Sequence, residues 1–130
     1  MSFVPTAPIG RSEAARAVIE AKQRRNLTWE AIAAELGRSK VWTTAALLGQ
    51  HRISDEMAST VGDLLGLEEA VVQALRLPPQ RGADAVDTTD PAVYRLEEMI
   101  QVYGGAVAEL IREEFGDGIM SAIDFEMDFR

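Results

Sequence analysis

Three polar residues in the last part of the chain have types and positions that suit anion chemistry. Arg95 is one of three cations among twelve acidic residues in residues 82–130, and Glu98 follows it three positions later on a predicted helix. Ser121 lies on the apolar face of a predicted strand, where a hydroxyl needs a hydrogen-bond partner. A guanidinium of fixed geometry with hydroxyl donors suits a small planar anion, and Glu98 could orient that guanidinium. Without further evidence, a surface ion pair between Arg95 and Glu98 and a Ser121 that is only a small residue in a tight place explain the pattern better than an anion-binding site does.

The composition leaves few other routes to catalysis. The chain has no Cys, one His (His51) and two Lys (Lys22 and Lys40). These counts exclude a thiolate nucleophile, a disulfide, a Cys-ligated zinc site and a multi-His metal site. Any catalysis must therefore rest on Arg, Asp or Glu, Ser or Thr, Tyr and backbone groups.

A long helix must position Arg95 and Glu98. Asp90 and Pro91 predict its start, because aspartate caps helices and proline suits the first helical position. The helix is expected to run to about Phe115, with the pair Gly104-Gly105 weakening its middle. One face of it is apolar and comprises Leu96, Met99, Ile100, Tyr103, Ala106, Val107, Leu110 and Ile111.

A β-strand is predicted to carry Ser121. Residues 119–129 alternate between a mainly apolar face and a face rich in acidic residues, which is the period of a strand. No other segment of the sequence predicts a strand clearly, so both edges of this one lack a partner within the chain. We infer an oligomer in which these segments pair between subunits.

The first part of the chain predicts a bundle of five short helices. Their predicted caps or starts are Ser12, Thr28, Ser39, Ser54 and Glu68, and glycines at 37, 49 and 66 are expected to end three of them. The second and third helices have a helix-turn-helix look, like that of lambda-repressor-like domains. The third presents mainly Val, Trp, Thr, Ala and Leu rather than base-reading side chains, although Arg38 and Lys40 could touch phosphate. This favours a packing module over a DNA reader.

The charge divides the chain at the Pro/Gly-rich stretch that follows Leu77. Residues 1–81 hold ten Lys and Arg against nine Asp and Glu, a sum of +1. Residues 82–130 hold three against twelve, a sum of −9, and the whole chain carries −8. We expect two domains, a helical bundle at 1–81 and a catalytic and oligomerisation unit at 82–130. The acidic balance argues against nucleic-acid binding and a polybasic membrane anchor, and the absence of a long apolar run or signal peptide favours a cytoplasmic protein.

Two long motifs in the second unit resemble the cyanase family, whose members are also called cyanate hydratase or cyanate lyase. They are DPAVYRLEEMIQVYG at residues 90–104 and FGDGIMSAIDF at residues 115–125. The first unit is also similar to that family's helical domain, at LTWE in residues 27–30 and LLGQ in residues 47–50. Relative to the family pattern, which continues into a further strand-rich stretch, the sequence is expected to be shortened at its C-terminal end.

The resemblance implies a mainly α fold with a small α+β C-terminal unit and a bicarbonate-dependent lyase activity. Cyanate and bicarbonate would combine and lose carbon dioxide to give carbamate, which falls apart to ammonia and carbon dioxide. It implies no metal or organic cofactor, with bicarbonate as co-substrate, and a homodecamer of paired dimers with active sites between subunits. The implied catalytic residues are Arg95, which neutralises the anions, Ser121, which donates hydrogen bonds, and Glu98, which holds Arg95.

Two alternatives stay open at this point. One is a helix-turn-helix transcriptional regulator with a C-terminal dimerisation segment, which would bind DNA with a steep dependence on salt. The other is an inactive, shortened paralogue that only assembles with longer partners.

Overall fold

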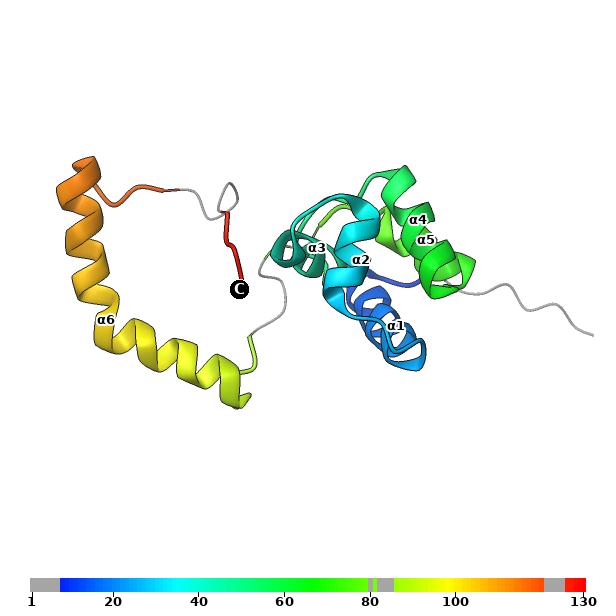
Figure 1. Cartoon of the computed structure of the whole chain (residues 1–130), viewed down its shortest axis with the longest axis horizontal. Helices are drawn as coiled ribbons and strands as arrows, with labels where there is room; N and C mark the ends of the chain where they lie inside the picture. Colours follow the sequence, from blue (N-terminus) through cyan, green and yellow to red (C-terminus); the bar gives the residue numbers. More distant parts are fainter. Residues whose placement is uncertain (1–7, 80, 82–85, 121–125) are drawn as a thin grey trace, which may run out of the picture. The chain divides into compact units, whose positions relative to one another are not determined.

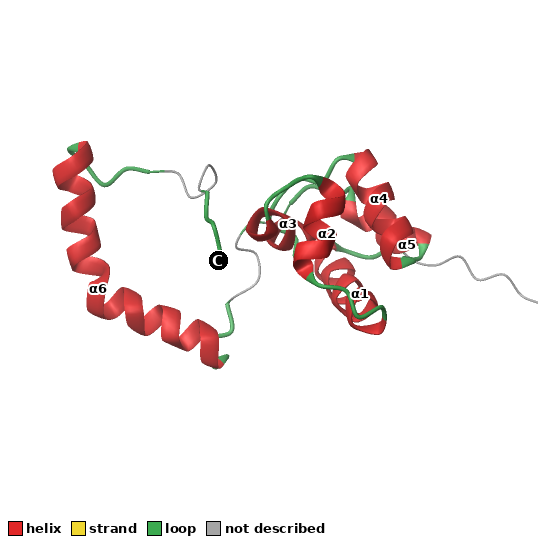
Figure 2. Ribbon diagram, viewed as in Figure 1, coloured by secondary structure: helices red, strands yellow, loops and turns green. Residues whose placement is uncertain are grey.

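The computed structural model of the chain describes residues 8–79, 81, 86–120 and 126–130. Its helices (Figures 1 and 2) are α1 (Arg11–Arg24), α2 (Trp29–Leu36), α3 (Lys40–Leu47), α4 (Asp55–Leu65), α5 (Glu69–Leu75) and α6 (Pro91–Phe115). Contacts divide the described chain into two units. Helices α1–α5 and residues 126–130 belong to one unit, and α6 belongs to the other. The fold is therefore mainly helical, as expected.

Side-chain caps define the starts of α2, α3 and α4. The hydroxyls of Thr28, Ser39 and Ser54 each accept a hydrogen bond from a backbone N–H three residues later, at 3.1 Å. Each hydroxyl satisfies a donor that the first helical turn leaves without a partner. Gly37 and Gly66 end α2 and α4 in the left-handed conformation, with φ of 65° and 64°. These predicted caps and ends are confirmed.

The predicted cap of the first helix is wrong. Helix α1 begins at Arg11 after Gly10, so Ser12 lies inside its first turn. The local pattern suggested a serine cap, but the helix starts after Gly10, which is extended and has no side chain to cap it. Helix α5 begins one residue later than predicted and α3 ends one residue earlier, which are ordinary differences at helix ends.

The core of the first unit is built from small and branched apolar side chains. Helix α1 packs against α4 and α5, while α2 packs against α3 and α4. The largest fully buried apolar side chains are Ile32, Leu47, Leu65, Leu75, Val18 and Val61. Trp29 and Trp42 are partly buried against this cluster. Burying these faces is what holds together helices that are each too short to be stable alone.

A buried arginine ties the ends of the bundle together. Arg11 is only 2% exposed, and its guanidinium donates to the backbone carbonyls of Ala46 at 2.7 Å, Leu77 at 2.9 Å and His51 at 3.2 Å. Burial lowers its pKa from the usual value. These carbonyls end or follow α3 and α5, so one side chain on α1 donates to acceptors near two helix ends, of which that of Ala46 also accepts from the Gly49 N–H at 3.0 Å.

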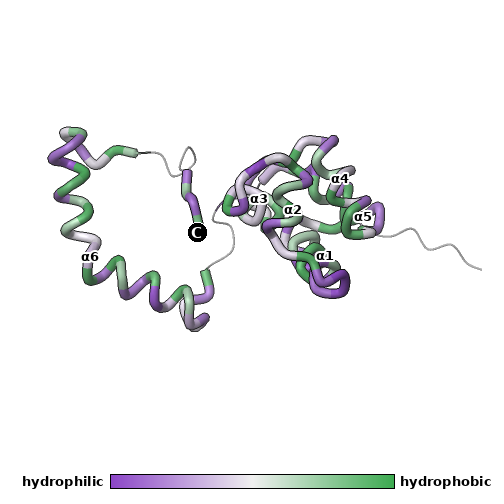
Figure 3. The backbone as a smooth tube through the Cα atoms, in the orientation of Figure 1, coloured by the Kyte–Doolittle hydropathy of each residue, from purple (hydrophilic) through white to green (hydrophobic). Residues whose placement is uncertain are grey.

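Helix α6 buries no residue in the single chain. Most of its large apolar side chains are half or more exposed, including Leu96, Met99, Ile100, Tyr103, Val107 and Leu110, whereas Val93 and Ile111 are partly buried. The hydropathy-coloured tube in Figure 3 shows apolar and polar positions alternating along this helix. In Figure 1 the helix changes direction near its middle, and Gly104-Gly105 lies at the middle of its sequence. Glycine pairs are a usual cause of such a bend.

The predicted strand at 119–129 is not confirmed. Residues 121–125 lie outside the described part of the chain, and the flanking residues 119–120 and 126–130 are not in a strand. A strand whose partner belongs to another subunit has nothing to pair with in one chain. No described helix is both long and apolar enough to cross a bilayer.

Candidate active site

The start of α6 sets the position of the candidate site. The Asp90 carboxylate accepts hydrogen bonds from the N–H groups of Ala92 at 2.9 Å and Val93 at 3.2 Å, and Pro91 occupies the first helical turn. These bonds fix where the first turn begins, so the positions of the next residues around the helix follow from it. Arg95 therefore lies one turn into the helix, with Glu98 almost one turn further on.

Arg95 and Glu98 form an ion pair on the surface of α6. The Nη1 of Arg95 donates to Oε2 of Glu98 at 3.2 Å, as the i+3 spacing predicts. The Arg95 guanidinium also lies 5.4 Å from the centre of the Tyr94 ring. The two charged side chains are 71% and 54% exposed, so their attraction is screened by water and stabilises the helix only slightly. The geometry shows a guanidinium held by a carboxylate, with its other N–H groups available to an anion.

The third predicted catalytic residue, Ser121, lies outside the described residues. The structure thus brings two of the three residues together, and the place of Ser121 stays a prediction. The roles of all three residues are likewise predictions.

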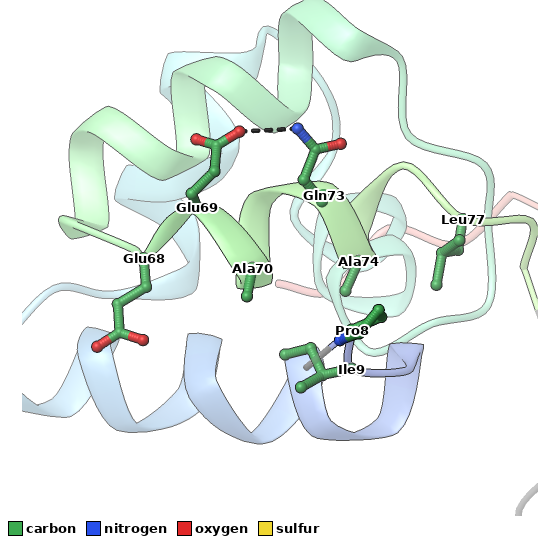
Figure 4. A pocket seen from close by; sticks show the side chains of 8 residues that line it. All are labelled: Pro8, Ile9, Glu68, Glu69, Ala70, Gln73, Ala74 and Leu77. Carbon is green, nitrogen blue, oxygen red and sulfur yellow. Dashed lines mark hydrogen bonds between the residues drawn. The ribbon is translucent and has the colours of Figure 1, made fainter. Parts of the chain in front are cut away.

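Two clefts of the first unit are lined by neither Arg95 nor Glu98. One, of about 560 Å³, lies between the segment before α1 and helix α5 (Figure 4). It is lined by apolar side chains with Glu68 and Glu69 at one end, and Glu69 accepts a hydrogen bond from Gln73 at 2.7 Å. Since the cleft offers carboxylates and no cation, it does not suit an anionic substrate. Among the described residues, no cluster of three or more His, Cys, Asp or Glu could hold a metal ion.

A group of arginines was missed by the sequence reasoning. Arg38, Arg52 and Arg76 line one cleft of the first unit, together with Trp42 and the start of α4. Their positions in the sequence are far apart, and only Arg38 had been considered for anion contact. The convergence depends on the packing of three elements, so no local pattern could have shown it.

Comparison with known proteins assigns both parts of the chain to the same family. The family model "Cyanate hydratase, N-terminal" matches residues 11–79, and "Cyanate lyase C-terminal domain" matches residues 85–130. The second match contains Arg95, Glu98 and Ser121. The two matches together cover most of the chain.

Individual relatives agree with the family models. A cyanate hydratase of Mycobacterium avium is 46% identical over 121 residues, which are 92% of this chain and 78% of the relative. One of Thiobacillus denitrificans is 48% identical over 119 residues, covering 91% of this chain and 81% of the relative. The crystal structure of cyanase from T. urticae matches with a TM-score of 0.75 and 40% identity, covering 85% of this chain and 80% of that one.

The helical bundle and the segment that contains the long helix are thus each matched by a model of a lyase family. The chain belongs to the cyanate hydratase family.

Proposed function

We propose that this protein decomposes cyanate in a reaction that requires bicarbonate. The observation that carries the proposal is the match to the cyanate lyase C-terminal domain across residues 85–130, the segment that contains all three candidate residues. Cyanate and bicarbonate join to a dianion, which loses carbon dioxide and takes up one proton to give carbamate. Carbamate takes up a second proton and breaks into ammonia and carbon dioxide. The protein is accordingly a hydro-lyase.

Each residue has a role that its chemistry supports. Arg95 binds the two anions and stabilises the dianion, where negative charge is greatest. Glu98 holds the guanidinium through the 3.2 Å ion pair, which keeps its remaining donors in a fixed plane. Ser121 donates a hydrogen bond to a substrate oxygen. In this proposal no metal or organic cofactor takes part.

The exposure of the pair supports an active site that is completed by other subunits. At 71% exposure, Arg95 acts through water, where two charges 4 Å apart attract by only about 1 kcal/mol. Covering the site with other copies removes water and strengthens the same contacts several-fold. The exposed apolar side chains of α6 also need a partner. We therefore include in the proposal an oligomer, a decamer of five dimers, in which the strand at 119–129 pairs between subunits.

The chain offers a matched pair of variants for the test. Arg112 donates to Glu109 at 3.1 Å with the same i+3 spacing on the same helix as Arg95 and Glu98. Arg95→Ala should lower ammonia release from cyanate by at least about 100-fold, whereas Arg112→Ala should retain most of it. Both should show the helical circular dichroism of the unaltered protein.

The assay measures ammonia with and without added bicarbonate. Release should depend on bicarbonate. With carbon dioxide purged at pH 7, the reaction should consume three protons for each ammonium formed, two in the decomposition and one taken up by ammonia, which a pH-stat records independently. Full activity of Arg95→Ala would remove Arg95 from the site. Ammonia release that is unchanged in bicarbonate-free buffer would contradict the reaction.

A further inference from the structure

A second charged feature lies away from the candidate active site. Three arginines line a cleft of about 610 Å³ in the first unit, which we call the arginine cleft: Arg38 from the turn before α3, Arg52 from the segment before α4, and Arg76 at the end of α5. The start of α4, capped by Ser54, forms part of its wall. The N-terminal end of a helix carries partial positive charge, so it adds to the field of the arginines.

Aromatic stacking holds part of this charge in place. The Arg38 guanidinium lies 3.6 Å from the centre of the Trp42 ring, and the His51 ring stacks parallel to Trp42 with centres 5.6 Å apart. Burial lowers the pKa of His51, and the neighbouring Arg81 and Arg38 lower it further. Two separate arginines thus act on one imidazole, which indicates that positive potential gathers on this side of the bundle.

The cleft has acidic groups of its own, but they neutralise only part of it. Arg76 lies 3.6 Å from the Asp55 carboxylate, and Glu56 is also at the rim. Within the described part of the chain, neither Arg38 nor Arg52 has an acidic partner within ion-pair distance. These two arginines are the ones available to a further anionic group.

The complementary charge lies at the C-terminal end of α6. Glu109, Glu113, Glu114 and Asp117 lie there with Arg112 as the only cation, and Arg112 already pairs with Glu109. The C-terminal end of a helix carries partial negative charge, so acidic residues at this end are unfavourable without an external cation. This arrangement is destabilising in the single chain and becomes favourable when it meets a positive surface.

We infer that the arginine cleft binds the acidic C-terminal end of α6 from a second copy of this chain. In this contact the carboxylates of Glu113 and Glu114 face the guanidinium groups of Arg38 and Arg52. The positive end of α4 then faces the negative end of the partner's α6. The contact uses other residues than the proposed strand pairing and the proposed catalytic residues, and its test measures assembly rather than catalysis.

A second copy fits these observations better than the same chain or a nucleic acid. Helix α6 has 25 residues, a path of about 37 Å along its bent axis, and this whole path separates its acidic end along the chain from the segment that follows the bundle. A nucleic acid would meet an overall charge of −8, and α3 offers it Val41, Thr44 and Leu48 rather than base-reading side chains.

Charge reversal in both surfaces tests the contact. The double variant Arg38→Glu/Arg52→Glu and the double variant Glu113→Lys/Glu114→Lys should each weaken assembly of the full chain by at least about tenfold in sedimentation velocity. An equimolar mixture of the two should assemble again, because the reversed charges are complementary. Arg16→Glu, which reverses an exposed charge on α1 outside the arginine cleft, should assemble like the unaltered protein.

Any of three results overturns the inference. The unaltered protein is monomeric in sedimentation velocity, either double variant assembles like the unaltered protein, or the mixture of the two variants does not assemble. A gel-shift result would also overturn it. In that result the unaltered protein retards a DNA duplex at low salt, Arg38→Glu/Arg52→Glu does not, and the assembly of the two proteins is the same. If a glutamate variant does not fold by circular dichroism, Arg38→Gln/Arg52→Gln removes the charge without reversing it, and this variant should lose part of the association.

Discussion

Replacing Arg11 with methionine should destabilise the helical bundle severely. Arg11 is 2% exposed and donates to three carbonyls, two of them at 2.9 Å or less. Methionine fills a similar volume but donates nothing, so the carbonyls of Leu77 and His51 lose this donor and the carbonyl of Ala46 keeps only the N–H of Gly49. Hydrogen bonds to a charged group contribute about 1.5 kcal/mol or more each, so the two short bonds alone predict a loss of about 3 kcal/mol. For a unit of this size that corresponds to a fall in Tm of roughly 12–24 °C.

Tryptophan fluorescence reads this change directly, because both tryptophans of the chain, Trp29 and Trp42, lie in the bundle. Urea unfolding of the full chain at one subunit concentration gives the free energy of unfolding for Arg11→Met and for Arg16→Met. Arg16 is exposed on the same helix, so its replacement should change the free energy by less than about 0.5 kcal/mol. A loss below about 1 kcal/mol in Arg11→Met would refute the role given to the three carbonyl bonds.

Three further changes test the packing and charge of the same unit. Thr43→Val should raise the free energy of unfolding by about 1 kcal/mol in urea titrations, because the hydroxyl of Thr43 is fully buried and has no hydrogen-bond partner among the described residues; a loss would show that it has one. Gly62→Ala should cost about 1 kcal/mol in the same titration, because its new methyl group would lie 2.7 Å from a methyl of Val72 and the crowding exceeds the gain in helix propensity. Gly62→Ala/Val72→Ala should then show no additional loss from the alanine at 62. Because the pKa of His51 is lowered in the folded chain, the unfolded chain binds more protons below about pH 6.5, and the free energy of unfolding falls as the pH drops through that value. His51→Gln should remove this contribution to the pH dependence of the free energy of unfolding. An unchanged pH dependence in that variant would contradict the role of His51.

Sequence reasoning succeeded where structure is decided within a few residues. The cap at Ser54 acts on a donor three positions later, and the carboxylate of Asp90 acts on the next turn, so both could be predicted from neighbours in the chain. The pairing of Arg95 with Glu98 follows from helical spacing in the same way.

It failed where distant parts of the chain decide. The burial of Arg11 in the bundle was not predicted, because its acceptors lie 35 to 66 positions away. The arginine cleft joins Arg38, Arg52 and Arg76 from three elements, and only the fold shows that they meet. The strand predicted to carry Ser121 would need a partner chain, and a single chain does not contain that partner.

The unburied face of α6 has a consequence for how the protein is made. Helices α1–α5 contact one another within one chain, so the bundle can form in a unimolecular step soon after synthesis. Helix α6 cannot complete its packing in the same way, because none of its residues is buried within its own chain. Its completion is then a bimolecular event whose rate rises with the number of copies present. In a cell that makes little of the protein, a new chain exposes the apolar face of α6 for longer than in a cell that makes much of it. During that interval the exposed face is a binding site for chaperones.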